Sequence, residues 1–213
     1  MELTLYTAHT KALMDQNLLN QLLAQLPASL HSRAHRYKSD LSAYNYVVGR
    51  LLLKRGLESF GYEADLEKIE LEENGKPYLP GIAFNISHSD HQVICAFANE
   101  GAIGIDLEKV KPIDFSDFTS MFSPREWQMI ISAEDAMHTF YWFWTRKESI
   151  IKAMGLNLSY LDQIELDVSK DHFEVDGEQW FLKELEIGEG YIGSICSRNP
   201  SVKIKYVEVQ LAD

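Results

Sequence analysis

Hydrophobic residues along the chain follow two periods, and each period predicts a different kind of element. A spacing of three to four residues, typical of an amphipathic helix, recurs in three stretches, and an alternating pattern typical of strands fills much of the rest. The helices are expected at 18–26, 41–60 and 135–154, and the strands at 3–6, 69–71, 83–86, 93–98, 103–110, 164–168, 180–185, 191–195 and 202–209.

Residues that favour helix ends support several of these bounds. Gly61 and Gly155 follow the second and third helices, where glycine readily ends a helix. A further helix is expected to begin after Ser123, because serine is a good N-cap and Pro124 suits the first helical position. Glu126 stands where a capping box places its acidic residue.

The order of helices followed by short strands occurs once in each half of the chain. The length of 213 residues fits one large domain or two of roughly 100 residues each. We therefore predict an α+β fold built as a pseudo-dimer of two similar lobes, each a small, mainly antiparallel sheet packed with helices. The N-terminal lobe is expected to span residues 1–101 and the C-terminal lobe residues 102–213.

Composition narrows the classes of function. With 20 basic and 32 acidic residues the net charge is −12, which argues against a general nucleic-acid binder. The N-terminus has an acidic second residue and no apolar segment typical of a signal peptide, and no apolar stretch approaches the ~20 residues of a membrane span. We expect a cytoplasmic protein without a membrane partner. Cys95 and Cys196 lie in apolar runs and are expected to be buried thiols.

Basic residues are concentrated in one part of this acidic chain. Residues 31–55 hold six lysines and arginines against a single acidic residue. An anionic ligand would bind most readily at this basic segment.

An acidic motif occurs at 104–108, with the sequence GIDLE. On a strand, Gly104, Asp106 and Glu108 share one face, so the two carboxylates lie side by side next to a glycine that leaves room for a ligand. A divalent cation such as Mg²⁺ would relieve their mutual repulsion. The alternative is an exposed strand with a solvated acidic face.

A second charged motif lies on the helix at 135–154. Its first turns are apolar all round, which indicates burial, and Trp144, Glu148 and Lys152 fall on one stripe. A carboxylate and an ammonium on a buried helix need partners. The alternative is an ordinary surface pair of Glu148 and Lys152.

A third motif, FNISHS at 84–89, leads a strand into hydroxyl and imidazole groups. Such a strand end can bind phosphate oxygens, or its serines can cap a turn. A nucleophilic pair of Ser87 and His88 is disfavoured, because neighbouring residues of a strand point to opposite faces.

Taken together, these motifs resemble the 4′-phosphopantetheinyl transferases. The resemblance is carried by GIDLE at 104–108, WTRKESIIK at 144–152, GKP at 75–77 and FNISHS at 84–89, in the order typical of the large, two-lobed class that includes the enzyme activating surfactin synthetase. It implies an enzyme, working as a monomer, that moves the phosphopantetheine arm of coenzyme A to a serine of an apo acyl or peptidyl carrier protein. Adenosine 3′,5′-bisphosphate is the other product.

The resemblance also assigns roles to residues of this chain. Glu148, Lys152 and Asp106 would be catalytic, with Glu148 as the general base. The implied Mg²⁺ ligands are Asp106, Glu108 and Glu148, and the implied coenzyme A contacts are Arg33 and Arg36 near the 3′-phosphate, Gly75, Lys76 and Pro77 along the adenine, and Ser87, His88 and Lys152 at phosphates. Glu126 matches a further acid of the family, but its capping-box position explains it equally well.

The chain departs from the family pattern at two basic positions. Asn45 stands where relatives often carry arginine, and Leu30 where a lysine is common. Both changes remove positive charge, so tolerance of 3′-dephospho-coenzyme A is a hypothesis. Two other functions compete with transfer: a non-catalytic protein that binds carrier protein or coenzyme A on the same fold, and a Mg²⁺-dependent phosphohydrolase.

Overall fold

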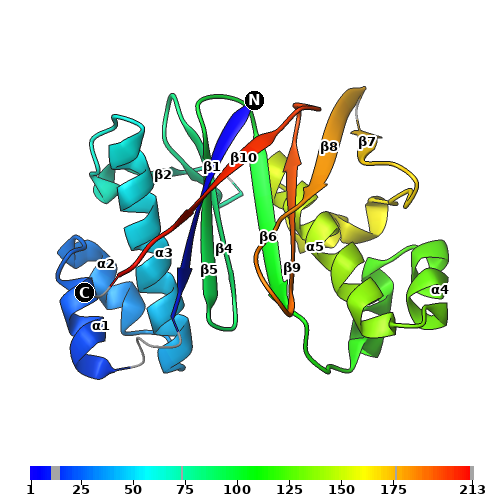
Figure 1. Cartoon of the computed structure of the whole chain (residues 1–213), viewed down its shortest axis with the longest axis horizontal. Coiled ribbons are helices and arrows are strands. Elements are labelled where there is room, and N and C mark those ends of the chain that lie inside the picture. Colours follow the sequence, from blue (N-terminus) through cyan, green and yellow to red (C-terminus); the bar gives the residue numbers. More distant parts are fainter. Residues whose placement is uncertain (11–14, 73, 176, 212–213) are drawn as a thin grey trace. The chain divides into compact units, whose positions relative to one another are not determined.

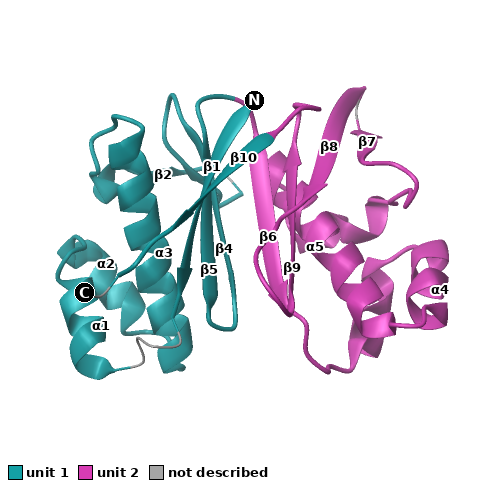
Figure 2. Cartoon of the chain, in the orientation of Figure 1, with its two compact units in different colours: residues 1–100, 203–213 teal, residues 101–202 magenta. Residues whose placement is uncertain are grey.

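The computed structural model describes residues 1–10, 15–72, 74–175 and 177–211. The fold is mixed α+β, which confirms the predicted class, and the chain forms two compact units (Figure 2). Unit 1 comprises residues 1–100 and 203–213, and unit 2 comprises residues 101–202.

Unit 1 is built on a four-stranded sheet in the order β10-β1-β5-β4 (Figure 1). The pairs β1–β5 and β4–β5 are antiparallel, whereas β1 and β10 are parallel. Its elements are β1 (Glu2–His9), α1 (Gln16–Leu23), α2 (Ala28–Ala34), α3 (Asp40–Ser59), the 3-10 helix η2 (Leu66–Lys68), the short pair β2 (Glu70–Leu71) and β3 (Pro77–Tyr78), β4 (Ala83–Ser89), β5 (Gln92–Ala98) and β10 (Lys203–Glu208).

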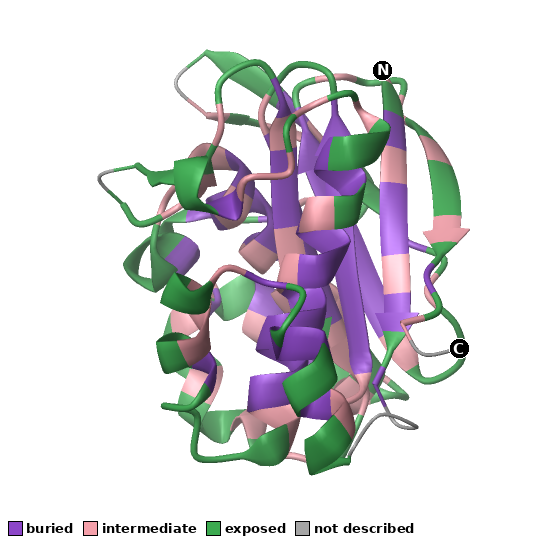
Figure 3. Ribbon diagram, turned by 90° about the vertical axis from the view of Figure 1, so that its left-hand side faces the viewer, coloured by how far each residue is buried: buried purple, intermediate pink, exposed green. Residues whose placement is uncertain are grey.

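The long helix α3 supplies much of the core of unit 1. Most of its side chains between Ala43 and Leu57 are buried, and Gly61 follows the helix in the left-handed region with φ +80°, as its predicted role as a stop requires. Every residue of β5 is buried, including Cys95. Figure 3 shows this pattern: interior strands are buried along their length, while helices alternate between buried and exposed residues.

The last strand differs from the prediction that residues 102–213 form one lobe. Residues 203–213 belong to unit 1, because β10 pairs with β1 over six residue pairs from Glu2↔Lys203 to Thr7↔Glu208. The boundary between the first unit and the second lies between residues 100 and 101, one residue before the predicted boundary. A parallel pair needs a long connection, and nothing in the local pattern of 202–209 specifies which strand it joins.

Unit 2 contains an antiparallel sheet in the order β6-β9-β8-β7. Two helices and two 3-10 segments complete the described part of this unit. In chain order the elements are β6 (Ile103–Lys109), η3 (Phe115–Met121), α4 (Pro124–Ser132), α5 (Ala136–Met154), η4 (Leu158–Gln163), β7 (His172–Val175), β8 (Glu178–Glu184) and β9 (Tyr191–Ser197). Cys196 on β9 is a buried free thiol, as expected.

The helix ends of unit 2 agree with the sequence. Ser123 and Glu126 form the reciprocal capping box at the start of α4, and Gly155 ends α5 in the left-handed region. The apolar first turns of α5 pack aromatic rings against one another, with Phe140 and Trp144 stacked at 5.9 Å between ring centroids. No helix among the described residues is both long and apolar enough to cross a membrane.

The strand expected at 164–168 is wrong. This segment is not part of a strand and runs into a turn at Val168, with Ile164 and Leu166 buried in the core of unit 2. The Leu166 amide donates to the Glu126 side chain at 2.9 Å, so a carboxylate replaces the strand partner that an extended backbone would otherwise need. The alternation of apolar residues in this segment therefore indicates burial, and it does not indicate pairing in a sheet.

A close contact between β6 and α5 depends on Gly104. A Cβ atom added at Gly104 would overlap the carbonyl oxygen of Ser149 and the amide nitrogen of Ala153, both on α5. The interpretation that this glycine leaves room for a ligand is therefore wrong: the space is filled by the helix backbone. The contact brings the face of β6 that carries Asp106 directly against α5.

Gly104→Ala should separate the strand from the helix and lower the free energy of unfolding by roughly 1–3 kcal/mol or more, because overlap with backbone atoms cannot be relieved by a rotamer change. Urea denaturation measures the loss. Gly193→Ala on β9 is the matched control, since a Cβ there would lie 3.2 Å from the nearest atom, the Asp106 carbonyl oxygen. Equal losses in the two variants would contradict the assignment.

Candidate active site

The two acidic residues of β6 lie on the strand face that α5 covers. Asp106 is 3% exposed and Glu108 is half-buried. Asp106 pairs in register with Ser194 of β9, whose hydroxyl lies 3.4 Å from that of Ser149 on α5. The alternative of a solvated acidic face is thus excluded for Asp106, whose carboxylate lies under the helix.

Helix α5 places a cation between two carboxylates. Lys152 Nζ donates to Asp106 Oδ1 at 2.6 Å and lies 3.7 Å from Glu148 Oε2. The Glu148 side chain is 13% exposed and the Lys152 side chain 29%. The Glu148–Lys152 pair is therefore not an ordinary surface pair, because it is joined to a buried aspartate on a neighbouring strand.

Burial and mutual charge shift the protonation of this cluster. Burial raises the pKa of Glu148 above its ordinary value and repulsion from Asp106 adds to the rise, while Lys152 acts in the opposite direction. Burial alone would lower the pKa of Lys152, but attraction from Asp106, Glu148 and Glu108 outweighs it, so the pKa of Lys152 is raised. Glu148 therefore binds a proton more readily than an ordinary glutamate, and Lys152 keeps its positive charge.

The carboxylates suit a magnesium ion by their chemistry. Mg²⁺ takes hard oxygen ligands, commonly one or two protein carboxylates with water and substrate phosphates completing the shell. Asp106, Glu108 and Glu148 supply such oxygens. Within the described part of the chain, no three His, Cys, Asp or Glu side chains are grouped so that they could hold a metal ion. Two of these carboxylates, Asp106 and Glu148, meet the Lys152 ammonium in the structure.

Glu126 lies in a separate buried network. It is 1% exposed, forms the capping box with Ser123, and pairs with Lys147 at 2.7 Å between Oε2 and Nζ. The sequence left two explanations for Glu126: an acid shared with the family, or a helix cap. The structure shows the cap, and it adds an ion pair with Lys147, the residue before Glu148.

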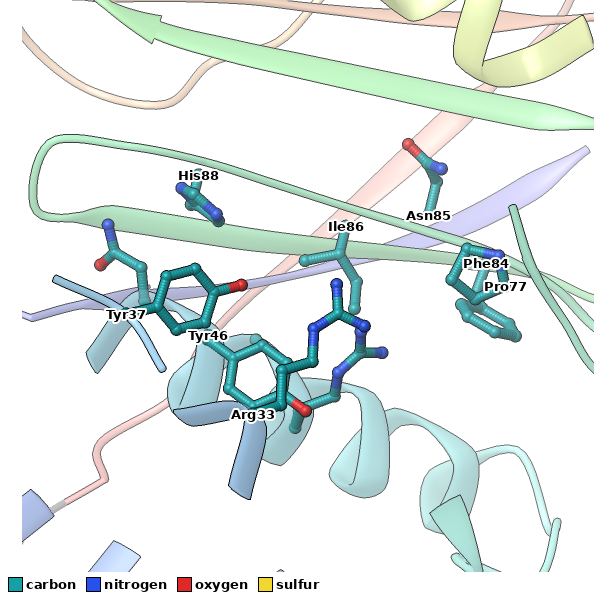
Figure 4. A pocket seen from close by; sticks show the side chains of 11 residues that line it. Arg33, Tyr37, Tyr46, Pro77, Phe84, Asn85, Ile86 and His88 are labelled. Carbon is teal, nitrogen blue, oxygen red and sulfur yellow. The ribbon is translucent and has the colours of Figure 1, made fainter. Parts of the chain in front are cut away.

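A second candidate site is a pocket in unit 1 with a volume of about 220 Å³. It is lined by Arg33 of α2, by Tyr46 and Arg50 of α3, by Pro77 of β3 and by His88 of β4, together with Tyr37, Asn45, Gly49, Phe84, Asn85 and Ile86. Figure 4 shows Ile86 directed from β4 toward Tyr46 and Arg33. Whole small-molecule sites occupy about 300–1,000 Å³, so this pocket suits one part of a larger ligand.

Of the eight residues expected to contact coenzyme A, three line this pocket and five do not. One of the five is Lys152, which lies on α5 in unit 2. Arg33, Pro77 and His88 are among its walls. Ser87 is buried and points to the strand face opposite His88, as alternation requires. The remaining residues that lie outside the lining are Arg36, which is exposed, and Gly75 and Lys76, which form the turn before β3.

Sequence reasoning did not single out Tyr46 and Arg50. The guanidinium carbons of Arg33 and Arg50 lie 5.4 and 5.3 Å from the centroid of the Tyr46 ring. Neither arginine forms an ion pair with a carboxylate of the described residues. The signal that could have found them is their spacing of four residues within the basic segment, which puts Tyr46 and Arg50 on one face of α3.

The two departures from the family pattern have structural explanations. Asn45 is 4% exposed; its amide donates to the Asp90 carbonyl at 2.8 Å and its carbonyl accepts from Thr10 at 3.3 Å. Leu30 packs on the core of unit 1. Asn45 therefore ties α3 to the turn between β4 and β5, and Arg50 supplies a cation one turn further along the same helix.

Comparisons with known proteins agree with this arrangement. Residues 102–196 match the family model described as the 4′-phosphopantetheinyl transferase superfamily. A 4′-phosphopantetheinyl transferase of Bacillus subtilis is 30% identical over 193 residues, which are 85% of this chain and 86% of the relative. The transferase Sfp of B. subtilis strain 168 is 30% identical over 200 residues, or 88% of each chain.

This chain belongs to the 4′-phosphopantetheinyl transferase superfamily. A third relative, the 4′-phosphopantetheinyl transferase HetI of Nostoc sp. strain PCC 7120, is 33% identical over 164 residues, which are 71% of this chain and 68% of HetI. The superfamily match includes β6 and α5, the elements that carry Asp106, Glu148 and Lys152.

Glu148→Gln is expected to stabilise this superfamily member at pH 7 in the absence of divalent cations. Because its pKa is raised on folding, ionised Glu148 destabilises the folded state above that pKa, and the penalty disappears below the ordinary value of 4.5. Thermal unfolding should give a higher midpoint for the variant at pH 7 and a shrinking difference toward pH 4.

The matched control is Glu174→Gln on β7, where the carboxylate is exposed. It should unfold at the wild-type midpoint. A Glu148→Gln protein that is less stable than the wild type at pH 7 would show that the pair with Lys152 outweighs burial.

Proposed function

We propose that this protein is a 4′-phosphopantetheinyl transferase that moves the phosphopantetheine arm of coenzyme A to a serine of an apo acyl or peptidyl carrier protein. The observation that carries the proposal is the cluster of Asp106, Lys152 and Glu148 in a chain of this superfamily. The serine oxygen bonds to the β-phosphorus, and the bond from that phosphorus to the bridging oxygen breaks. Adenosine 3′,5′-bisphosphate leaves with the electron pair, and the serine proton passes to a base.

The charged cluster of unit 2 suits this reaction. Lys152 neutralises charge that develops on the pyrophosphate, and Asp106 holds its ammonium in place. Glu148 acts as the general base for the serine hydroxyl, which its burial and raised pKa favour. Positioning and charge neutralisation then supply most of the rate enhancement.

Asp106, Glu108 and Glu148 are the residues that would hold Mg²⁺. When bound, the ion would neutralise the negative charge of the pyrophosphate oxygens. Support comes from the oxygen donors on adjoining elements β6 and α5 and from the family to which the chain belongs.

The pocket of unit 1 suits the 3′-phosphoadenosine end of coenzyme A. Arg33 and Arg50 provide two guanidinium groups for a phosphate, Tyr46 and Pro77 provide apolar surface for the adenine, and His88 provides a further donor. Family resemblance adds Arg36, Gly75, Lys76 and Ser87 as contacts outside the pocket lining. We infer that the two units are related lobes of a pseudo-dimer and that one chain acts as a cytoplasmic monomer, since it carries both groups of residues.

Incubation with an apo carrier protein, coenzyme A and Mg²⁺, followed by mass spectrometry of the carrier, tests the function. We expect the carrier to gain the mass of one phosphopantetheine group. An unmodified carrier in a panel of several would favour the non-catalytic binding protein, and free phosphopantetheine beside an unmodified carrier would favour the phosphohydrolase.

Glu148→Gln should lower kcat for transfer by about 10²–10⁴-fold, the usual contribution of a general base, and leave the fold intact. Far-ultraviolet circular dichroism checks the fold and carrier mass checks the activity. Exposed Glu174→Gln should transfer at the wild-type rate. Retained activity in Glu148→Gln would remove Glu148 as the base.

Arg50→Gln should weaken the use of coenzyme A more than that of 3′-dephospho-coenzyme A. A hydrogen bond to a charged group contributes ~1.5–3 kcal/mol, so we expect kcat/KM for coenzyme A to fall about 10- to 100-fold. Arg55→Gln is the control, because Arg55 is an exposed arginine of the same helix and lies outside the pocket lining. Equal losses with both cofactors would place the 3′-phosphate away from Arg50.

A further inference from the structure

Lys147, the residue before the candidate base, is a buried cation on the core side of α5. Its side chain is 1% exposed. Nζ pairs with Glu126 Oε2 at 2.7 Å and donates to the carbonyl oxygens of Met121 and Leu161, each at 2.9 Å. An ammonium has three N–H donors, so these three acceptors use its full capacity.

The partner carboxylate is equally engaged. Glu126 Oε2 also accepts from the Ser123 amide at 2.8 Å, and Oε1 accepts from the Leu166 amide at 2.9 Å. Through one ion pair, α5 is connected to the end of η3, the start of α4, η4 and the backbone at Leu166. The connection joins four separate segments of unit 2 to a single point on the helix.

This network and the β6 contact hold α5 from different sides. Successive residues of a helix are turned by about 100°, so Lys147 and Glu148 point in different directions. Lys147 reaches the layer of η3, α4 and η4, whereas Ser149 and Ala153 meet the backbone of β6 at Gly104. Rotation of α5 that moved Glu148 and Lys152 away from Asp106 would have to break one of these contacts.

Stability alone does not account for a charge at this position. A well-packed apolar pair of similar volume is often as stable as a buried ion pair, or more so, because two charges need not be desolvated. An apolar pair has no directional contacts, whereas each hydrogen bond of the buried pair restricts the distance and angle between the helix and its neighbours. A buried pair with every donor and acceptor used is suited to set geometry.

We propose that Lys147 and Glu126 are positioning residues that fix the rotation of α5, so that Glu148 and Lys152 face Asp106 in the geometry that transfer requires. The proposal rests on the proposed transferase function. Neither residue touches the reacting atoms; each acts through the helix that bears the base.

Two double variants separate positioning from stability. Glu126→Gln/Lys147→Met and Glu126→Met/Lys147→Met remove both charges, whereas Lys147→Met alone leaves a buried carboxylate without its cation. The single variant should be strongly destabilised in urea, and at least one double variant should recover much of that loss. In the recovered variant we expect kcat to remain about 10²-fold below wild type, the cost of a misplacement near 1 Å, with KM for coenzyme A little changed.

The matched control is Arg146→Met, which removes the neighbouring cation of the same helix. Arg146 is bound to the exposed Glu184 at 3.5 Å and lies over the Trp142 ring, outside the network. Its kcat should stay near wild type. A double variant that recovers stability and has wild-type kcat would overturn the proposal. Failure of both double variants to fold would also overturn it, because the ion pair would then be required for folding itself.

The wild-type protein in the same assay separates this proposal from the proposed function. Without transfer by the wild type, the transferase function fails. With transfer by the wild type and undiminished kcat in a stable double variant, only the positioning role fails.

Discussion

The close approach of α5 to β6 at Gly104 is the constraint on which the candidate site depends. A strand and a helix meet there without an intervening side chain, so charges on both elements come within hydrogen-bonding distance. Lys152 then pairs with Asp106, and Glu148 is buried next to both. Two pKa shifts follow from that geometry. Burial raises the pKa of Glu148, and attraction from the neighbouring carboxylates raises the pKa of Lys152.

The two units concentrate opposite charges within a chain of net charge −12. Unit 1 places Arg33 and Arg50 on the ring of Tyr46 at a pocket, and unit 2 pairs Asp106 and Glu148 with Lys152. A reaction on a nucleotide-linked pyrophosphate needs a site that binds an anion and a group that accepts a proton. The two arrangements suit these two requirements. The net charge of the chain reveals neither cluster, because each cluster consists of a few neighbouring side chains.

Much of the site could be predicted because its determinants are local. The capping box of Ser123 and Glu126, the left-handed stop at Gly155 and the stripe of Glu148 and Lys152 depend on residues within one or two helical turns. The same holds for the alternation that puts His88 in the pocket and Ser87 on the other face of β4.

What the sequence did not reveal depends on contacts between distant segments. The partner of β10 is β1, some 200 residues earlier, and a long separation leaves no trace in local periodicity. Leu166 alternates like a strand residue, yet the Glu126 side chain satisfies its amide. The pattern around Gly104 predicts space for a ligand, whereas the packed structure shows α5 in that space.

The stoichiometry of the two products tests the central claim most directly. Coenzyme A and an apo carrier would be mixed with the protein in a single turnover, and the modified carrier and adenosine 3′,5′-bisphosphate would be quantified in the same samples. Transfer requires one bisphosphate for each modified serine, with equal time courses. Bisphosphate released without carrier modification, or neither product with an active reference transferase as a control, would contradict the account.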